Sequence, residues 1–222
     1  MRPPEQTVPD ELLGCWQRQW ISFADGTRDN TTFVVWLQLP SLMADVRLSA
    51  EALALAGRSA FSMKELLELA ESDSSSGATV CTPVIDGTAT AEWSTAVGFQ
   101  PVSAFPEPGL LEWSADGTVM MERAPSGAYV EEWHLLPDSR GSLTHSVLAD
   151  GSSFYRAGSV GVLVRDRPGQ VPPVSRLSEL FDRAELEAAL DCEFSFCQLT
   201  DGVWTIGCST LPGRVGVNLR PT

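Results

Sequence analysis

Residues 16–47 read WQRQWISFADGTRDNTTFVVWLQLPSLMADVR, and this stretch decides the fold. It holds two aromatic runs separated by an Asp-Gly turn, and then a third run that carries an acid and a base. Side chains two positions apart lie on the same face of a β-strand. The alternation therefore predicts three groups of side chains, each on one face of its strand. In two groups polar side chains lie beside tryptophan rings, and in the third an acid lies beside a base: Trp16, Arg18 and Trp20; Trp36 and Gln38; Asp45 and Arg47.

The rest of the chain continues as short apolar runs separated by turn signals. Asp-Gly dipeptides suit the positive φ of tight hairpin turns. They recur five times, beginning at Asp25, Asp86, Asp116, Asp150 and Asp201. A capping box at Ser62 and Glu65 begins one helical segment, and residues 175–190 hold a second, which a further cap at Asp182 is expected to divide. The pattern predicts an all-β fold with minor α-helical content.

Two features suggest that the chain has two halves. Proline and glycine gather at residues 101–109, which marks a boundary. Trp16 and Trp36 are 20 residues apart, as are Trp113 and Trp133, and each pair encloses an Asp-Gly turn. This spacing is typical of an internal duplication. We therefore expect two tandem antiparallel β-barrels with short helical insertions, packed closely together: residues 9–104 and residues 105–222.

The charge of the chain excludes several classes of partner. Lysine and arginine total 15 and aspartate and glutamate total 29, so the net charge is −14. Such a surface repels the phosphates of nucleic acids and of anionic membranes. No apolar run approaches the roughly 18 residues of a membrane-spanning helix, and the first ten residues lack the apolar core of a secretory signal. We expect a cytoplasmic protein with no nucleic-acid partner and no membrane partner.

Few residues are available for metal or nucleophilic chemistry. The chain has five cysteines without C-x-x-C spacing, and its only histidines are His134 and His145. These counts argue against a disulfide framework and against a multi-histidine metal site. The G-x-S-x-G motif of triad hydrolases and the complete phosphate-binding loop are both missing from the sequence. We therefore expect neither a metal nor a cofactor.

The stretch at residues 16–47 resembles a bacterial group of lipocalin-like proteins related to the fungal HRI1 proteins. The resemblance covers residues 12–50 and extends more loosely over residues 91–133. It implies two lipocalin-like β-barrels in one chain, and the function of the group is poorly defined. The group carries a basic and an acidic residue in one later strand, where this chain has Thr95 and Gly98. Four short motifs carry the resemblance: Trp16-x-Arg18, Asp29-Asn30-Thr31-Thr32, Trp36-Leu37-Gln38 and Asp45-x-Arg47.

One cluster of side chains is a candidate ligand-binding site. Arginines framed by indoles clamp a carboxylate well, because the guanidinium group presents a fixed fork of donors. The alternative is structural, with Asp45 pairing with Arg18 or Arg47 to fix the register of the strands. The ligand-binding candidates are Trp16, Arg18, Trp20, Trp36, Gln38, Arg47, Trp133 and His145.

A second cluster holds the catalytic candidates His134, Glu131 and Tyr129. Alternation places Tyr129 and Glu131 on one face of a strand and His134 on the other. If the strands flanking residues 137–142 pair, His134 and His145 approach each other, and a histidine beside a glutamate acts as a general acid and base. Isolated histidines are more often surface residues. A third group offers paired carboxylates, which support glycoside chemistry, although glutamates in so acidic a chain are expected to face outward. Its members are Glu92 with Trp93, Glu112, Glu122, Glu131 and Glu132.

Three functions fit these observations. The first is binding of a small, mostly apolar organic molecule inside a barrel, which encloses a cavity lined by aromatic side chains and a few polar anchors. The second is a cofactor-independent enzyme of cyclase, isomerase or lyase type in a specialised metabolic pathway. The third is a protein-interaction module that uses an exposed barrel face. The expected partner is a small-molecule ligand or substrate, and association as a homodimer stays open.

Overall fold

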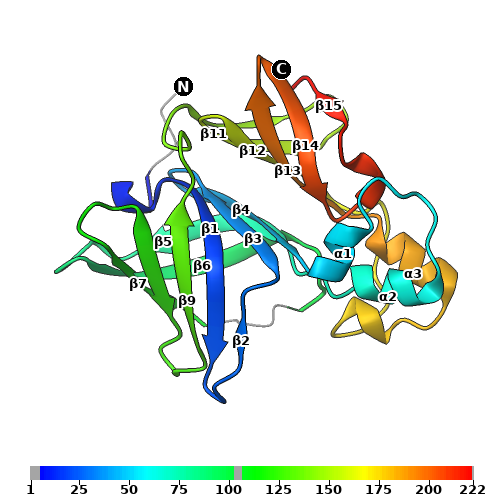
Figure 1. Cartoon of the computed structure of the whole chain (residues 1–222), viewed down its shortest axis with the longest axis horizontal. Helices are drawn as coiled ribbons and strands as arrows, with labels where there is room; N and C mark the ends of the chain where they lie inside the picture. Colours follow the sequence, from blue (N-terminus) through cyan, green and yellow to red (C-terminus); the bar gives the residue numbers. More distant parts are fainter. Residues whose placement is uncertain (1–5, 103–106, 222) are drawn as a thin grey trace.

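The computed structural model describes residues 6–102 and 107–221. Within these residues the chain forms two antiparallel sheets and three short α-helices (Figure 1). The first sheet contains β1 (Gly14–Phe23), β2 (Arg28–Asp29), β3 (Phe33–Gln38), β4 (Leu42–Leu48), β5 (Ser75–Cys81), β6 (Thr88–Gly98), β7 (Gly109–Trp113), β8 (Val119–Arg123) and β9 (Tyr129–Leu135).

The first sheet is a closed barrel. Its strands follow the order β2-β1-β3-β4-β5-β6-β7-β8-β9, and an additional pairing joins β1 to β9. The short β2 pairs with β1 beyond the region where β3 does, so eight strands form the closed wall. Closure gives each wall strand two neighbours and leaves one set of alternating side chains inside the barrel.

The second sheet is open. It contains β10 (Leu143–Val147), β11 (Ser153–Ala157), β12 (Val160–Arg165), β13 (Glu193–Thr200), β14 (Val203–Ser209) and β15 (Asn218–Leu219), paired in that order. Within the described parts of the chain, no pairing joins its outer strands, β10 and β15. The all-β class with minor α content is confirmed, whereas the expected second barrel is not.

The first barrel extends well beyond the expected half of the chain. The boundary expected at residues 104 and 105 lies outside the described residues, but the strands on either side of it, β6 and β7, pair with each other. Trp113 and Trp133 therefore belong to the same barrel as Trp16 and Trp36. The equal spacing of the two tryptophan pairs reflects strands of one barrel and does not mark a second one.

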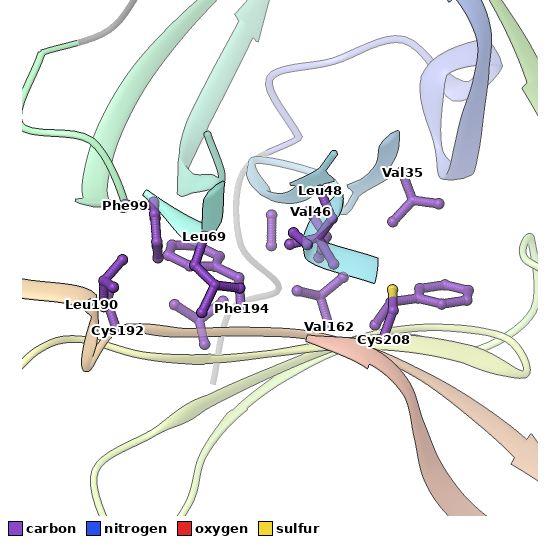
Figure 2. Packing of buried hydrophobic residues seen from close by; sticks show 14 of the residues in the cluster. Val35, Val46, Leu48, Leu69, Phe99, Val162, Leu190, Cys192, Phe194 and Cys208 are labelled. Atoms are coloured by element: carbon purple, nitrogen blue, oxygen red, sulfur yellow. The ribbon is translucent and has the colours of Figure 1, made fainter. Parts of the chain in front are cut away.

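A large apolar core joins the barrel to the second sheet. Val35 and Leu37 on β3 and Val46 and Leu48 on β4 point out of the barrel into this core. Figure 2 shows Val46 and Leu48 facing Val162, Phe194 and Cys208 of the second sheet. Because β3 is buried on both faces, its sequence is nearly continuously apolar, whereas β4 carries Asp45 and Arg47 on its inner face.

Three helices enlarge this core beside the two sheets (Figure 1). They are α1 (Ala50–Ala54), α2 (Met63–Leu69) and α3 (Arg183–Leu190). The predicted capping box of Ser62 is present, and Asp182 caps α3 and separates it from the short turn Leu177–Glu179. The helix α1, which Ser49 caps, was not predicted from the sequence. Among the described residues, no helix is both long and apolar enough to cross a bilayer.

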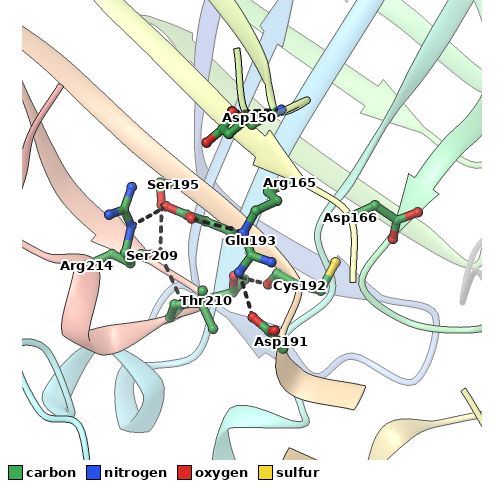
Figure 3. Close-up of polar contacts among 12 residues, drawn as sticks. Asp150, Arg165, Asp166, Asp191, Cys192, Glu193, Ser195, Ser209, Thr210 and Arg214 are labelled. Atoms are coloured by element: carbon green, nitrogen blue, oxygen red, sulfur yellow. Dashed lines mark hydrogen bonds and ion pairs between the residues drawn. The ribbon is translucent and has the colours of Figure 1, made fainter. Parts of the chain in front are cut away.

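A buried ionic network stabilises the second sheet (Figure 3). Glu193 is 3% exposed, and it accepts hydrogen bonds from Ser195 Oγ at 2.8 Å and from Arg214 Nε at 2.9 Å. Arg165 Nε lies 3.8 Å from the same carboxylate. These contacts tie β13 to β12 and to the chain after β14. Since each buried charge has a partner, we assign this network a structural role.

Candidate functional site

The barrel encloses a cavity of about 510 Å³. This volume lies within the range of small-molecule sites, which is roughly 300–1,000 Å³. Six acidic residues and one arginine contribute to its wall, together with two indoles. The lining residues are Trp36, Met43, Asp45, Arg47, Asp73, Ser74, Ser75, Glu92, Trp93, Thr95, Gly98, Gln100, Pro101, Glu107, Pro108, Glu122, Tyr129 and Glu131.

The N-terminal segment closes one end of the barrel. Thr7 donates hydrogen bonds from its backbone N–H to the Pro40 carbonyl and from its hydroxyl to the Thr79 carbonyl. These bonds fix the segment across that end of the barrel. The turn Asp10–Leu12 follows, and the buried Leu12 packs in the same apolar cluster as Trp16, whose Nε1 donates to the Leu12 carbonyl at 2.8 Å. The cavity therefore has an apolar floor.

The interior changes from apolar to polar along three neighbouring strands. Inward positions near the closed end carry Trp16 on β1, Met120 on β8 and Trp133 on β9, all fully buried. The next inward positions on the same strands carry charges: Arg18, Glu122 and Glu131. On β4 the order is the same, with Met43 followed by Asp45 and Arg47. Because inward positions recur at every second residue, a ring of ionisable side chains lies next to the tryptophan rings that form the floor of the cavity.

Arg18 is held by two carboxylates. Its Nη1 lies 2.9 Å from Glu131 Oε1, and its Nη2 lies 3.0 Å from Asp29 Oδ2. The Arg18 side chain is only 6% exposed. Because both forks of the guanidinium group are engaged, Arg18 orients Glu131 and has little capacity left for a ligand.

Arg47 is paired within its own strand. Its Nε donates to Asp45 Oδ2, while Asp45 Oδ1 accepts hydrogen bonds from the backbone and the hydroxyl of Ser75. Burial raises the pKa of Asp45, and Arg47 opposes that rise. The predicted pair of Asp45 with Arg47 is present, and it joins β4 to β5; Arg18 pairs elsewhere.

Glu122 and Glu131 form the most unusual pair in the cavity. They lie directly opposite each other on β8 and β9, with 5% and 3% of their surfaces exposed. Burial, followed by the charge of Glu131, raises the pKa of Glu122 to about 8. The Tyr129 hydroxyl donates to Glu122 Oε1 at 3.0 Å, and burial also raises the pKa of this phenol. At neutral pH the pair therefore holds a proton on Glu122.

Trp93 forms the wall beside Glu122. Its ring meets Trp36 edge-on, with centroids 5.6 Å apart, and Trp36 meets Trp133 in the same way at 5.8 Å. Gly109 on β7 permits the approach of Trp93 to Glu122, because an added Cβ would lie 2.5 Å from Trp93 Cη2 and 3.0 Å from Glu122 Oε1. The indole ring of Trp93 and the buried carboxyl group of Glu122 thus both lie close to Gly109.

Several ligand-binding candidates lie at or under this cavity. Trp36 and Arg47 line it, as do the catalytic candidates Tyr129 and Glu131. Trp16 and Trp133 belong to the floor, and Arg18 lies behind Glu131. Gln38 is fully buried, where it accepts from Trp36 Nε1 at 3.1 Å and from Thr79 Oγ1 at 2.8 Å. The contacts of Gln38 fix the floor.

Three other candidates lie away from the cavity. The register of β1 against β9 shifts between Arg18 and Trp20, so the prediction that Trp20 shares a face with Trp16 and Arg18 is wrong. The Cζ atom of Arg28 lies 4.2 Å from the centroid of the Trp20 ring. His134 faces outward on β9, and its Nε2 lies 2.9 Å from Glu132 Oε1. His145 is on β10 of the second sheet, and its ring centroid lies 4.7 Å from that of Tyr155. The strands of His134 and His145 belong to different sheets.

Glu122 and Trp93 were named in the third group of the sequence but not among the candidate site residues. Glu122 was expected to face outward, yet it is 5% exposed and points into the barrel. Its signal was the alternation of Met120 and Glu122, which parallels Trp133 and Glu131 on the neighbouring strand. Considering residues 6–102 and 107–221, no group of three histidine, cysteine or acidic side chains is arranged to hold a metal ion.

Comparison with known proteins shows the fold alone. The sequence matches no family model and no curated protein. The structure is similar to the crystal structure of the uncharacterized protein YLR301w from Saccharomyces cerevisiae, with a TM-score of 0.57 and 12% sequence identity. The similarity covers 88% of this chain and 84% of the yeast chain. The chain thus shares its overall fold with a yeast protein.

Proposed function

We propose that the protein binds a small organic molecule with an apolar body inside its barrel. The cavity of about 510 Å³, with an indole floor and a ring of buried ionisable groups, is the observation that supports this function. Apolar surface contributes affinity, and a few polar groups fixed by their own partners contribute orientation. The sequence analysis expected a mostly apolar ligand, but this wall also favours a ligand with a polar end.

We also infer that the chain is a lipocalin-like relative of the HRI1 proteins. The motifs Trp16-x-Arg18 and Asp45-x-Arg47 support this inference, because they supply the floor and the ion pairs of the barrel. The fold shared with the yeast protein agrees with it at the level of architecture. The proposed binding function is supported by the cavity and does not depend on this relationship.

A second candidate function is acid-base catalysis without a cofactor. The specific observation is the buried Glu122 directly opposite the buried Glu131, with the Tyr129 hydroxyl 3.0 Å from Glu122 Oε1. A carboxylic acid with a pKa of about 8 beside a carboxylate is suited to deliver one proton and remove another. This assignment keeps Glu131 and Tyr129 from the sequence analysis and replaces His134 by Glu122.

Thermal shift across a metabolite panel tests the binding function. Thr95 is an exposed residue that lines the cavity, whereas its neighbour Ser94 does not line it, so Thr95→Trp is designed to obstruct the cavity where it meets solvent, and Ser94→Trp is the matched control. A ligand at a hundredfold excess over its Kd raises the Tm of wild type and of Ser94→Trp by about 5–10 °C. Thr95→Trp loses that shift. Equal shifts in both variants place the ligand elsewhere and refute the proposal.

A further inference from the structure

We infer that the ligand is an organic cation whose protonated amine binds the carboxyl group of Glu122 on the cavity side, next to the ring of Trp93. The apolar part of the molecule then lies on Trp36 and Met43, toward the floor. This inference rests on the proposed binding function and specifies the chemical class of the ligand. It follows from the balance of charge in the cavity and from the pairing of carboxyl and indole.

The arginines near the cavity are already neutralised. Arg47 is paired with Asp45, and Arg18 bridges Glu131 and Asp29. Asp73 at the rim is paired with Arg176 at 3.0 Å. Among the described residues, no ion pair within 4.0 Å includes Glu122, although it is 5% exposed. A cationic ligand would supply the missing partner, whereas an anionic ligand would meet a wall of six acids and one arginine.

The wall beside Glu122 suits an ammonium group. Trp93 and Glu122 converge over Gly109, with Trp36 edge-on behind Trp93. An ammonium group gains from the negative face of an indole and from a carboxylate at the same time, and both contributions increase when water is excluded. A neutral ligand would gain only the apolar contact with the indoles.

The ionisation of Glu122 provides a second readout. Glu131 faces it from β9 and raises its pKa, Arg47 on β4 opposes that rise, and Tyr129 donates a hydrogen bond to it. Trp93, which meets it from β6, carries no charge. A bound cation stabilises the carboxylate form, so Glu122 releases its proton when the cation binds. Affinity for a cation should therefore rise as the pH approaches about 8, the pKa of Glu122.

Calorimetric titration with three matched probes tests the inference. The probes are 2-phenylethylamine, 2-phenylethanol and 3-phenylpropanoate, which share an aromatic body and differ in charge. We expect the amine to bind wild type at least about tenfold more tightly than the alcohol, and the carboxylate to bind most weakly. Titrations of the amine in phosphate and in HEPES at pH 7 should show release of close to one proton.

Glu122→Gln should weaken amine binding about tenfold, abolish the proton release and leave alcohol binding unchanged. Glu132→Gln is the control, since it removes a carboxylate from the outer face of the same barrel. Equal affinities for amine and alcohol, or no effect of Glu122→Gln, would overturn the cation inference and leave the binding function standing. Failure of all three probes to bind at millimolar concentration would also overturn the cation inference. The binding function itself would be refuted only if the metabolite panel also gave no thermal shift.

Discussion

The protonated state of Glu122 makes stability depend on pH in a way that one substitution removes. The folded protein holds a pKa of about 8 at Glu122, against 4.5 as the ordinary value. Between these two values the folded state binds a proton that the unfolded chain releases, so stability is greatest below the lower value and is lost as pH rises toward the upper one. The slope approaches about 1.4 kcal/mol per pH unit for one proton.

Urea denaturation followed by tryptophan fluorescence at pH 5.5, 6.5 and 7.5 measures this slope. From pH 5.5 to 7.5 the Glu122 proton alone should lower the free energy of unfolding of wild type by about 2–3 kcal/mol. Glu122→Gln keeps an acceptor for Tyr129 and should lack this loss. Other groups, such as Asp45 with its raised pKa, are common to both proteins and cancel in the difference. Parallel pH profiles for wild type and variant would refute the raised pKa of Glu122.

Three further predictions concern single substitutions. Arg18→Ala leaves Glu131 without its partner and should lower the free energy of unfolding, measured by urea denaturation, by about 3–5 kcal/mol. Arg123→Ala, which breaks an exposed ion pair, should lower it by less than about 1 kcal/mol. Gly109→Ala should displace the ring of Trp93 and weaken 2-phenylethylamine binding in calorimetry without unfolding the barrel. Phe194→Ala should cost about 3–5 kcal/mol and lower one shared Tm for both sheets in circular dichroism, because its ring lies in the core that joins them; two separate transitions would contradict this.

Local patterns in the sequence predicted much of the fold. The Asp-Gly dipeptides do form turns, with positive φ at Gly26, Gly117 and Gly151. The capping box at Ser62 and the cap at Asp182 begin helices as expected. These features succeeded because each depends on residues within a few positions of one another.

Features that depend on distant residues were missed. The barrel closes through β1 and β9, whose paired residues Trp16 and Leu135 are far apart in sequence. A single shift of register after Arg18 turns Trp20 outward, and nothing in the local alternation reveals it. The second sheet stays open because its inner face is covered by the outer faces of β3 and β4 and by the helices, so it does not need to close on itself.

The candidate site shows the same division. Alternation correctly placed Tyr129 and Glu131 together on one face of β9. The burial of Glu122 was not predicted because a glutamate in an acidic chain is usually solvated, and the alternation of Met120 and Glu122 becomes informative only once β8 is paired with β9. The partner of Arg18 also depends on closure, since Glu131 comes from β9 and Asp29 from the short β2.

Native mass spectrometry of the protein purified gently from its own host tests the central claim most directly. A small molecule should be bound at a one-to-one ratio to wild type and to Ser94→Trp, and absent from Thr95→Trp, because only the last substitution places an indole at a residue that lines the barrel cavity. Denaturation of the complex should release an amine that is cationic at neutral pH. A ligand retained equally by Thr95→Trp would contradict a binding site inside the barrel.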